Sequence, residues 1–211
     1  MILAMENLVL DDRDDLAAKI ARQTLASRGS GYAAEVRRLL DAGREVMARC
    51  GTSSRPRVAD IVAAAGLSND AFYRHFASKD ALVAAILEDG TTRLHGYLAH
   101  QMDKEATPEG KVRRWVEGVL AQAADDSAAT TLAVLWNGGN VVDVSARPET
   151  ALAALLQAPF TDLGSDDAGL AASLVAHAVI GRLSDLLQHG IRPTAADTRR
   201  IVEFCLRAAG R

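Results

Sequence analysis

Aromatic side chains are scarce in this chain of 211 residues, which has only 2 Trp, 3 Tyr and 4 Phe. Strands are enriched in aromatic and β-branched residues, so the scarcity of aromatics beside abundant alanine disfavours a β-sandwich. Alanine and leucine are strong helix formers. The apolar fraction of 49% excludes a disordered chain. We therefore expect an all-α protein of about nine helices, because apolar residues recur at steps of three and four almost throughout.

Cysteine and histidine are also few. Cys50 and Cys205 lie 155 positions apart, and neither has a C-x-x-C partner. This excludes a cysteine zinc site and predicts no structural disulfide; two buried thiols are expected, with a redox sensor as the alternative. Four of the five histidines lie on predicted helices at spacings of 5, 77 and 12, so none forms the i, i+4 pair of a helical metal site. We predict no metal and no cofactor.

Catalytic and targeting signals are missing as well. The chain contains no G-x-S-x-G, phosphate-loop or H-E-x-x-H motif, which argues against an enzyme. No apolar run approaches the ~20 residues needed to cross a bilayer. The N-terminal stretch MILAMENLVLDDRDD has no basic residue before its apolar part, unlike a signal peptide. These absences predict a soluble, cytoplasmic protein with no membrane partner.

Helix boundaries are marked by capping chemistry. Thr107 precedes Pro108 and Glu109, which places a cap, an N1 proline and an acid in sequence. Thr194 and Asp197 form a candidate capping box. Other expected starts and ends are Gly51, Gly66, Ser78, Pro148, residues 165–167 and Gly190, with a loop over residues 137–147.

Residues 57–86 have the pattern of a helix-turn-helix, two short helices joined by a tight turn over a small shared core. Gly66 permits the turn because glycine adopts a left-handed backbone freely, and Ser68 caps the second helix. The inward positions are Ile61, Val62, Ala65, Leu67, Phe72 and Phe76, and the two phenylalanines are expected to anchor the second helix to Leu39 and Val46. The outward face is then left to Asn69, Asp70, Tyr73 and Arg74, with His75 beside them. Such a face predicts binding to double-stranded DNA.

The net charge of −3 alone argues weakly against a nucleic-acid partner, but the distribution of charge matters more. Residues 34–80 hold eight basic and six acidic side chains, an excess of two positive charges. The rest of the chain therefore carries an excess of five negative charges. The modest basic excess coincides with the helix-turn-helix.

This region resembles the DNA-binding domain of the TetR family of bacterial regulators. The segments Ala-Gly-Leu-Ser, Phe-Tyr-Arg-His-Phe and Ser-Lys-Asp-Ala-Leu match the family pattern in order and spacing. The match covers about 30 residues, and about 50 with the helix expected at 34–51. The resemblance implies a DNA-binding domain at 34–80 and a larger helical ligand-binding and dimerisation domain at 81–211. It further implies a transcriptional repressor released from a palindromic operator by a small apolar effector.

The resemblance also implies roles for single residues. Residues 68–75 would form the recognition helix in the major groove, with Asn69 and Arg74 as candidates to read base edges. Tyr73, His75 and Lys79 resemble the residues with which the family contacts phosphates. The full set of DNA-contact candidates is Arg57, Ser68, Asn69, Tyr73, Arg74, His75 and Lys79.

Three features depart from the family pattern. Arg57 replaces the usual Ser or Thr, so it can reach a phosphate without capping the helix. Asp70 and Ala71 replace a Gly and a Thr; Asp70 either stabilises the helix dipole, which we favour, or accepts from cytosine. Residues 1–33 form an extension with an amphipathic pattern, which suggests a docked leader or, alternatively, an arm that touches DNA.

The C-terminal half has no sequence motif, and two features are expected in it: a ligand cavity and a dimer interface. Residues lining an apolar ligand cavity are expected to include Met102, Trp115, Trp136, Phe160 and His177, although buried aromatics on helices are equally consistent with plain core. The resemblance implies a homodimer through residues 166–209; the alternative is that these helices complete a monomeric core.

Two other functions stay open. An all-α enzyme with an incidental helix-turn-helix is disfavoured by the missing motifs. A ligand-binding or protein-interaction module with degenerate DNA binding is kept open by Asp70 and the modest charge excess. Steeply salt-dependent duplex binding distinguishes a working regulator from that module.

Overall fold

The computed structural model describes residues 29–124, 127–138 and 148–210 and shows an all-α protein, as predicted. The described part contains nine α-helices and no strand. The first runs over residues 29–50. The others, in chain order, are α2 (Val58–Ala65), α3 (Asn69–His75), α4 (Lys79–Met102), α5 (Pro108–Leu120), α6 (Ser127–Gly138), α7 (Pro148–Asp162), α8 (Ala168–His189) and α9 (Ala195–Ala208), with a short 3₁₀ turn, η1, at Ala121–Ala123.

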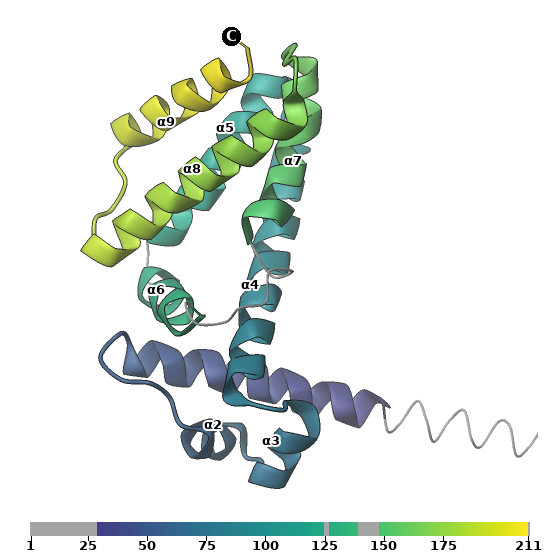
Figure 1. Ribbon diagram of the computed structural model, residues 1–211, viewed down its shortest axis with the longest axis vertical. Coiled ribbons are helices and arrows are strands. Elements are labelled where there is room, and N and C mark those ends of the chain that lie inside the picture. Colours follow the sequence, from purple (N-terminus) through teal and green to yellow (C-terminus); the bar gives the residue numbers. More distant parts are fainter. Residues whose placement is uncertain (1–28, 125–126, 139–147, 211) are drawn as a thin grey trace, which may run out of the picture.

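Two hydrophobic cores are joined by α4, whose 24 residues give it a length of about 36 Å. Leu82, Val83 and Ile86 at its start belong to the N-terminal core, and Leu98 and Met102 at its end belong to the C-terminal core. Figure 1 shows the helix of residues 29–50 crossing this first part of α4, with α2 and α3 beyond it and α5 and α7–α9 at the other end. One continuous helix therefore connects the two domains.

The N-terminal domain forms because the helix of residues 29–50 has an apolar face at helical spacing. Leu39 and Met47 on that face are fully buried, and Phe72 of α3 is buried in the same cluster. Gly43 allows the close crossing with α4, because a Cβ at this position would lie 2.7 Å from Cδ1 of Ile86. The predicted packing of α3 on this helix is confirmed.

The C-terminal domain is a bundle in which α7 packs on α8, and α5 packs on α4 and α9. Trp115 of α5 is completely buried at its centre. Its indole Nε1–H donates a hydrogen bond of 3.0 Å to the carbonyl of Leu152 on α7. This bond satisfies the polar atom that a buried indole would otherwise leave unpaired.

Most predicted boundaries are confirmed. Thr107 caps α5 with Pro108 as its first residue. Thr194 and Asp197 form the capping box of α9, and Gly190 ends α8 with a φ of 62°. Each boundary follows from local chemistry, which is why the sequence was sufficient to place it.

Two boundaries differ from the prediction. Residues 29–33 are already helical, so the DNA-binding domain includes part of what was assigned to the extension. Asn137 and Gly138 belong to α6, because Asn137 continues the helix and bonds through its side-chain amide to the carbonyl of Ala133. Residues 139–147 of the expected loop, and the amphipathic segment within residues 1–28, lie outside the described residues.

One expectation about hydrophobic runs also needs correction. Helix α8 is long and apolar enough to cross a membrane by length and composition alone. Val175, Val179 and Leu183 on one side of it are buried in the C-terminal core. Core helices meet the same criteria, and this packing accounts for the apolar residues on the buried side of α8.

Candidate nucleic-acid interface

Helices α2 and α3 form a helix-turn-helix whose turn is fixed by backbone geometry. Gly66 has a φ of 62°, in the left-handed region that favours glycine. The N–H of Leu67 returns to the carbonyl of Val62 at 2.9 Å, which closes the end of α2. Ser68 then caps α3 by accepting a hydrogen bond of 3.1 Å from the N–H of Ala71. The turn and the start of α3 are thereby held in one orientation.

The two faces of α3 are sharply different. Ala71 and Phe72 are buried against the domain core. Asn69, Tyr73 and Arg74 are exposed, and 58% of the surface of Tyr73 is accessible. Asp70 is exposed on the same side. The outward face expected from the sequence is therefore present on a helix anchored firmly from behind.

Two further candidates lie at helix starts. Arg57 occupies the N-cap position of α2 and is exposed, and its side chain makes no capping bond, as its chemistry dictates. Lys79 is the first residue of α4 and follows Ser78, which caps that helix by accepting from the N–H of Ala81. Both cations stand at helix N-termini, where the helix dipole also favours a nearby phosphate.

His75 is placed differently from the other candidates. It follows Ala71 and Phe72 by four and three positions, so it falls on the buried side of α3. Only 1% of its side chain is exposed, and Nε2 lies 2.7 Å from a carboxylate oxygen of Glu35. The ring also meets Tyr32 edge-on, with centroids 4.1 Å apart. The predicted phosphate contact of the His75 imidazole is corrected: the side chain links α3 to the helix of residues 29–50.

Glu35 and Tyr32 are residues of this site that the sequence analysis missed. The same Glu35 oxygen accepts a hydrogen bond of 3.1 Å from the guanidinium of Arg74. The bonds from His75 and Arg74 hold the pKa of Glu35 below its ordinary value. Glu35 is thus ionised at neutral pH. Because a carboxylate can only accept, the Nε2–H of His75 donates the hydrogen bond between them. Arg74, a candidate to read bases, is already paired with a carboxylate.

A separate pocket of about 500 Å³ lies between the two domains. Its apolar wall comes from α4, α5, α6, α7 and α8. Its lining residues are Arg44, Ile86, Leu87, Gly90, Thr91, Arg93, Leu94, Tyr97, Val119, Gln122, Ser127, Thr130, Thr131, Val134, Leu135, Pro148, Leu152, Ile180 and Leu183. Its volume lies within the range typical of small-molecule sites.

None of the five residues predicted to line a ligand cavity lines this pocket. Met102, Trp115 and Phe160 are buried in the packed C-terminal core. Trp136 is 43% exposed with the guanidinium of Arg55 5.8 Å from its ring centroid, and His177 is exposed on α8. The prediction selected large buried side chains and a histidine, whereas most of the pocket wall is aliphatic, with hydroxyl groups and two arginines among it. Among the described residues no group of His, Cys, Asp and Glu could hold a metal ion.

A capped helix α3 on a small core, joined by α4 to an all-helical domain with an apolar pocket, is the fold of helix-turn-helix transcriptional regulators. Residues 39–86 match the model of the "bacterial regulatory proteins, tetR family". This match identifies residues 39–86 as a DNA-binding domain of the TetR type.

Solved structures share the fold over most of the chain. A TetR-family transcriptional regulator from Mesorhizobium loti has a TM-score of 0.65 and 15% identity, over 84% of this chain and 96% of that one. The fatty acid degradation regulator FadR of Bacillus halodurans has a TM-score of 0.61 and 18% identity, over 82% and 94%. FadR of Bacillus subtilis, solved with stearoyl-CoA, has a TM-score of 0.55 and 16% identity, over 82% and 96%. No curated protein matches the chain in sequence.

Proposed function

We propose that this protein is a homodimeric transcriptional repressor that inserts α3 into the major groove of a palindromic operator. The observation that carries the proposal is the exposed face of α3, with Asn69, Tyr73 and Arg74 on a helix capped by Ser68 and anchored by Phe72. Phosphate contacts from Arg57, Tyr73 and Lys79 would set the orientation, and Asn69 and Arg74 would read bases.

A dimer is supported by the outer face of α8 and α9, which lie side by side in Figure 1. Leu170 and Leu174 of α8 are 57% and 62% exposed, and Phe204 of α9 is 49% exposed. Gly181 continues the α8 stripe, and a Cβ there would meet nothing within 4 Å. The single chain therefore gives no reason for glycine at this position, whereas a second helix packed closely against α8 would.

A small-molecule effector is supported by the position of the pocket. Helix α6 lines it through Thr130, Val134 and Leu135, and the same helix contributes Ala133 and Val134 to the N-terminal core. A ligand that displaces α6 or α4 would therefore move elements that support the DNA-binding domain. Release of DNA requires that the ligand bind the released conformation more tightly.

The direct test is a pull-down of fragmented genomic DNA from the source organism. Wild-type protein is compared with the double variant Tyr73→Ala/Lys79→Ala and with Arg113→Gln, a control on an exposed part of α5. We expect a palindromic site enriched by wild type and by the control, and lost in the double variant. Enrichment that survives the double substitution, or no enrichment by a folded dimer at low salt, would contradict the proposal.

A second function, an interaction module with degenerate DNA binding, is favoured by two observations. Asp70 places a negative charge on the exposed face of α3, and Glu35 occupies the guanidinium of Arg74. The salt dependence of duplex affinity separates the two. A regulator that neutralises several phosphates loses affinity steeply as salt rises, whereas a module with no DNA function gives a flat or absent response.

A further inference from the structure

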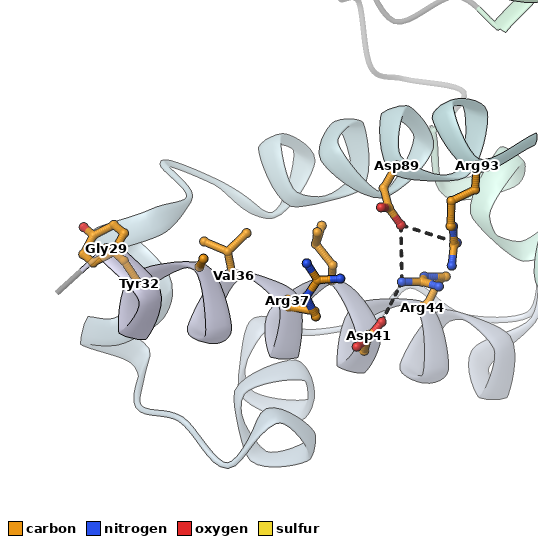
Figure 2. A pocket seen from close by; sticks show the side chains of 10 residues that line it. Gly29, Tyr32, Val36, Arg37, Asp41, Arg44, Asp89 and Arg93 are labelled. Atoms are coloured by element: carbon orange, nitrogen blue, oxygen red, sulfur yellow. Dashed lines mark hydrogen bonds and ion pairs between the residues drawn. The ribbon is translucent and has the colours of Figure 1, made fainter. Parts of the chain in front are cut away.

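Two arginines lie where the pocket meets the DNA-binding domain. Arg44 comes from the helix of residues 29–50 and Arg93 from α4, and both line the interdomain pocket described above. They also line a second groove, between those two helices, which Figure 2 shows from close by. In that view both guanidinium groups point toward Asp89 of α4. The two cations therefore stand at the boundary between an apolar pocket and the DNA-binding domain.

The charge of the pocket lining is one-sided. Arg44 and Arg93 are its only charged residues, and no carboxylate is among its described lining residues. The polar remainder consists of hydroxyl and amide groups, including Thr91, Thr131 and Gln122. Most of the wall is aliphatic. A neutral apolar ligand would leave the two cations without a partner on the pocket side.

The ion pairs of Arg44 and Arg93 leave part of their hydrogen-bonding capacity unused. Arg44 bonds closely to Asp41 at 2.7 Å, but its ion pair with Asp89 is 3.4 Å long. Arg93 also lies 3.4 Å from the same oxygen of Asp89. Charge-assisted hydrogen bonds are commonly about 2.7–2.9 Å, so one carboxylate is shared loosely between two cations. The Nε of Arg44 is moreover buried with no hydrogen-bond partner.

We propose that the pocket binds an amphipathic acid, an aliphatic chain or ring with one carboxylate that pairs with Arg44 and Arg93. This inference rests on the proposed effector site and names the chemical class of its ligand. The ligand carboxylate would take up the loosely paired charge of both arginines and offer an acceptor to the free Nε–H of Arg44. The aliphatic part would cover Leu87 and Leu94 of α4 and Leu183 of α8.

The acid group would also act on the link between the domains. Arg44 lies on the helix that supports α3, and Arg93 lies on α4, so a bidentate carboxylate would connect these two helices. Competition with Asp89 would replace a long ion pair by a short one. The head group of the ligand, rather than its apolar body alone, would thus contact the DNA-binding domain.

The test uses three probes with the same ten-carbon chain: decanoate, 1-decanol and decyltrimethylammonium. Binding to the full-length dimer is measured by calorimetry at neutral pH, below micelle-forming concentrations, for wild type, Arg93→Gln, Arg44→Gln and the control Arg113→Gln. We expect decanoate to bind about tenfold or more tightly than decanol, and the cationic probe no better than decanol. Arg93→Gln and Arg44→Gln should abolish most of the preference for the acid and leave decanol binding unchanged.

Arg93 is 57% exposed at its side chain, so Arg93→Gln should fold even if Arg44→Gln does not. Equal affinity for decanoate and decanol, an acid preference that survives Arg93→Gln, or no binding of any probe would each overturn the inference. Salt-dependent binding of duplex DNA is measured on the same preparations without probe. Absence of salt-dependent DNA binding in wild type contradicts the proposed regulator, whereas a wild type that binds DNA but does not prefer the acid contradicts only the ligand class.

Discussion

Glu35 links the helix of residues 29–50 to α3 through two side-chain contacts. Its carboxylate accepts from His75 at 2.7 Å and from Arg74 at 3.1 Å, and the side chain is 28% exposed. The lowered pKa of Glu35 has one consequence for pH. The stabilisation is fully present above the ordinary pKa of a glutamate and is lost as pH falls through the lowered value. At neutral pH the group carries a full negative charge beside the proposed DNA surface.

Glu35→Gln should therefore strengthen non-specific duplex binding at low salt. Glutamine can still accept from Nε2 of His75, but it no longer neutralises Arg74, which becomes available to phosphate. One additional phosphate contact makes the slope of log affinity against log salt steeper by about 0.9. Fluorescence anisotropy with a random duplex at several salt concentrations measures this slope.

The matched control for that experiment is Glu45→Gln. Glu45 lies on the same helix and pairs with Arg49 at 2.9 Å, both side chains being largely exposed and neither a DNA-contact candidate. The control should leave the slope at its wild-type value. An unchanged slope in Glu35→Gln, or an equal change in both variants, would contradict competition between Glu35 and phosphate for Arg74.

The two cysteines should differ in reactivity. Cys205 is fully buried in the C-terminal core, and burial raises the pKa of its thiol to about 12. Cys50 is half-buried at the end of the helix of residues 29–50. The thiolate is the reactive form of cysteine. With a chromogenic disulfide reagent at pH 8, native protein should therefore release one equivalent of the coloured thiolate per chain, and denatured protein should release two. The Cys50→Ser variant should release none while folded; a native reaction of Cys205 in that variant would show that the core opens readily.

At the scale of residues, local chemistry was predictable and long-range contacts were not. Gly66 and Ser68 act on backbone groups within four positions, so their roles follow from spacing alone. The inward orientation of His75 was also available from its spacing to Phe72, but the resemblance led to the opposite interpretation. Glu35 could not be found, because its partner lies 40 positions away.

At the scale of elements, the exposed stripe of α8 gives a sharp test of the proposed dimer. Gly181 and Gly96 are both exposed glycines within helices, and a Cβ at either would meet nothing within 4 Å. Leucine at either site should thus be accommodated by the monomer and favour the helix by about 1 kcal/mol. Only Gly181 lies on the proposed interface.

Gly181→Leu should accordingly shift the dimer toward monomer, while Gly96→Leu on α4 should remain dimeric. Light scattering behind size-exclusion chromatography measures the mass, and circular dichroism verifies that both variants are folded. Affinity for a two-half-site operator should fall with the loss of dimer, because each monomer reads one half-site. If the Gly181→Leu variant stays dimeric, the part of α8 around Gly181 does not belong to the dimer interface.

Helix ends were more predictable than the pocket for a physical reason. Caps at Thr107 and Thr194 satisfy backbone groups of their own helix, so they leave a signature in a few consecutive residues. The pocket is the space left where several helices fail to fill the interior. Its lining depends on their crossing geometry, and Met102, Trp115 and Phe160, which were chosen from the sequence, fill the core instead.

At the scale of the whole molecule, the question is whether the two domains behave as one cooperative unit. Helix α4 contributes to both cores, and α6 adds Ala133 and Val134 to the N-terminal one while Leu132 and Leu135 pack on the other. The exposed ring of Trp136 also faces Arg55 of the segment before α2. These shared elements predict that the domains unfold together, which an effector acting between them would require.

The variants Leu82→Ala and Leu98→Ala test this with a matched pair on one helix. Both side chains are fully buried, Leu82 in the N-terminal core and Leu98 in the C-terminal core. Each truncation should lower the free energy of unfolding by about 2–5 kcal/mol. Urea unfolding at fixed protein concentration is followed by far-ultraviolet circular dichroism, which reports all helices, and by tryptophan fluorescence in the Trp136→Phe background, which isolates the buried Trp115.

Coupled domains should give coincident curves in wild type and in both variants, because loss of either core then destabilises the whole chain. If α4 merely tethers two independent domains, Leu82→Ala should shift the start of the circular dichroism transition to a lower urea concentration. The urea midpoint of the Trp115 fluorescence transition should then stay unchanged. That separation would also weaken the proposed effector mechanism. A ligand in the pocket changes DNA affinity only through elements whose conformation both domains share, and separate unfolding would mean that α4 and α6 transmit little free energy between them.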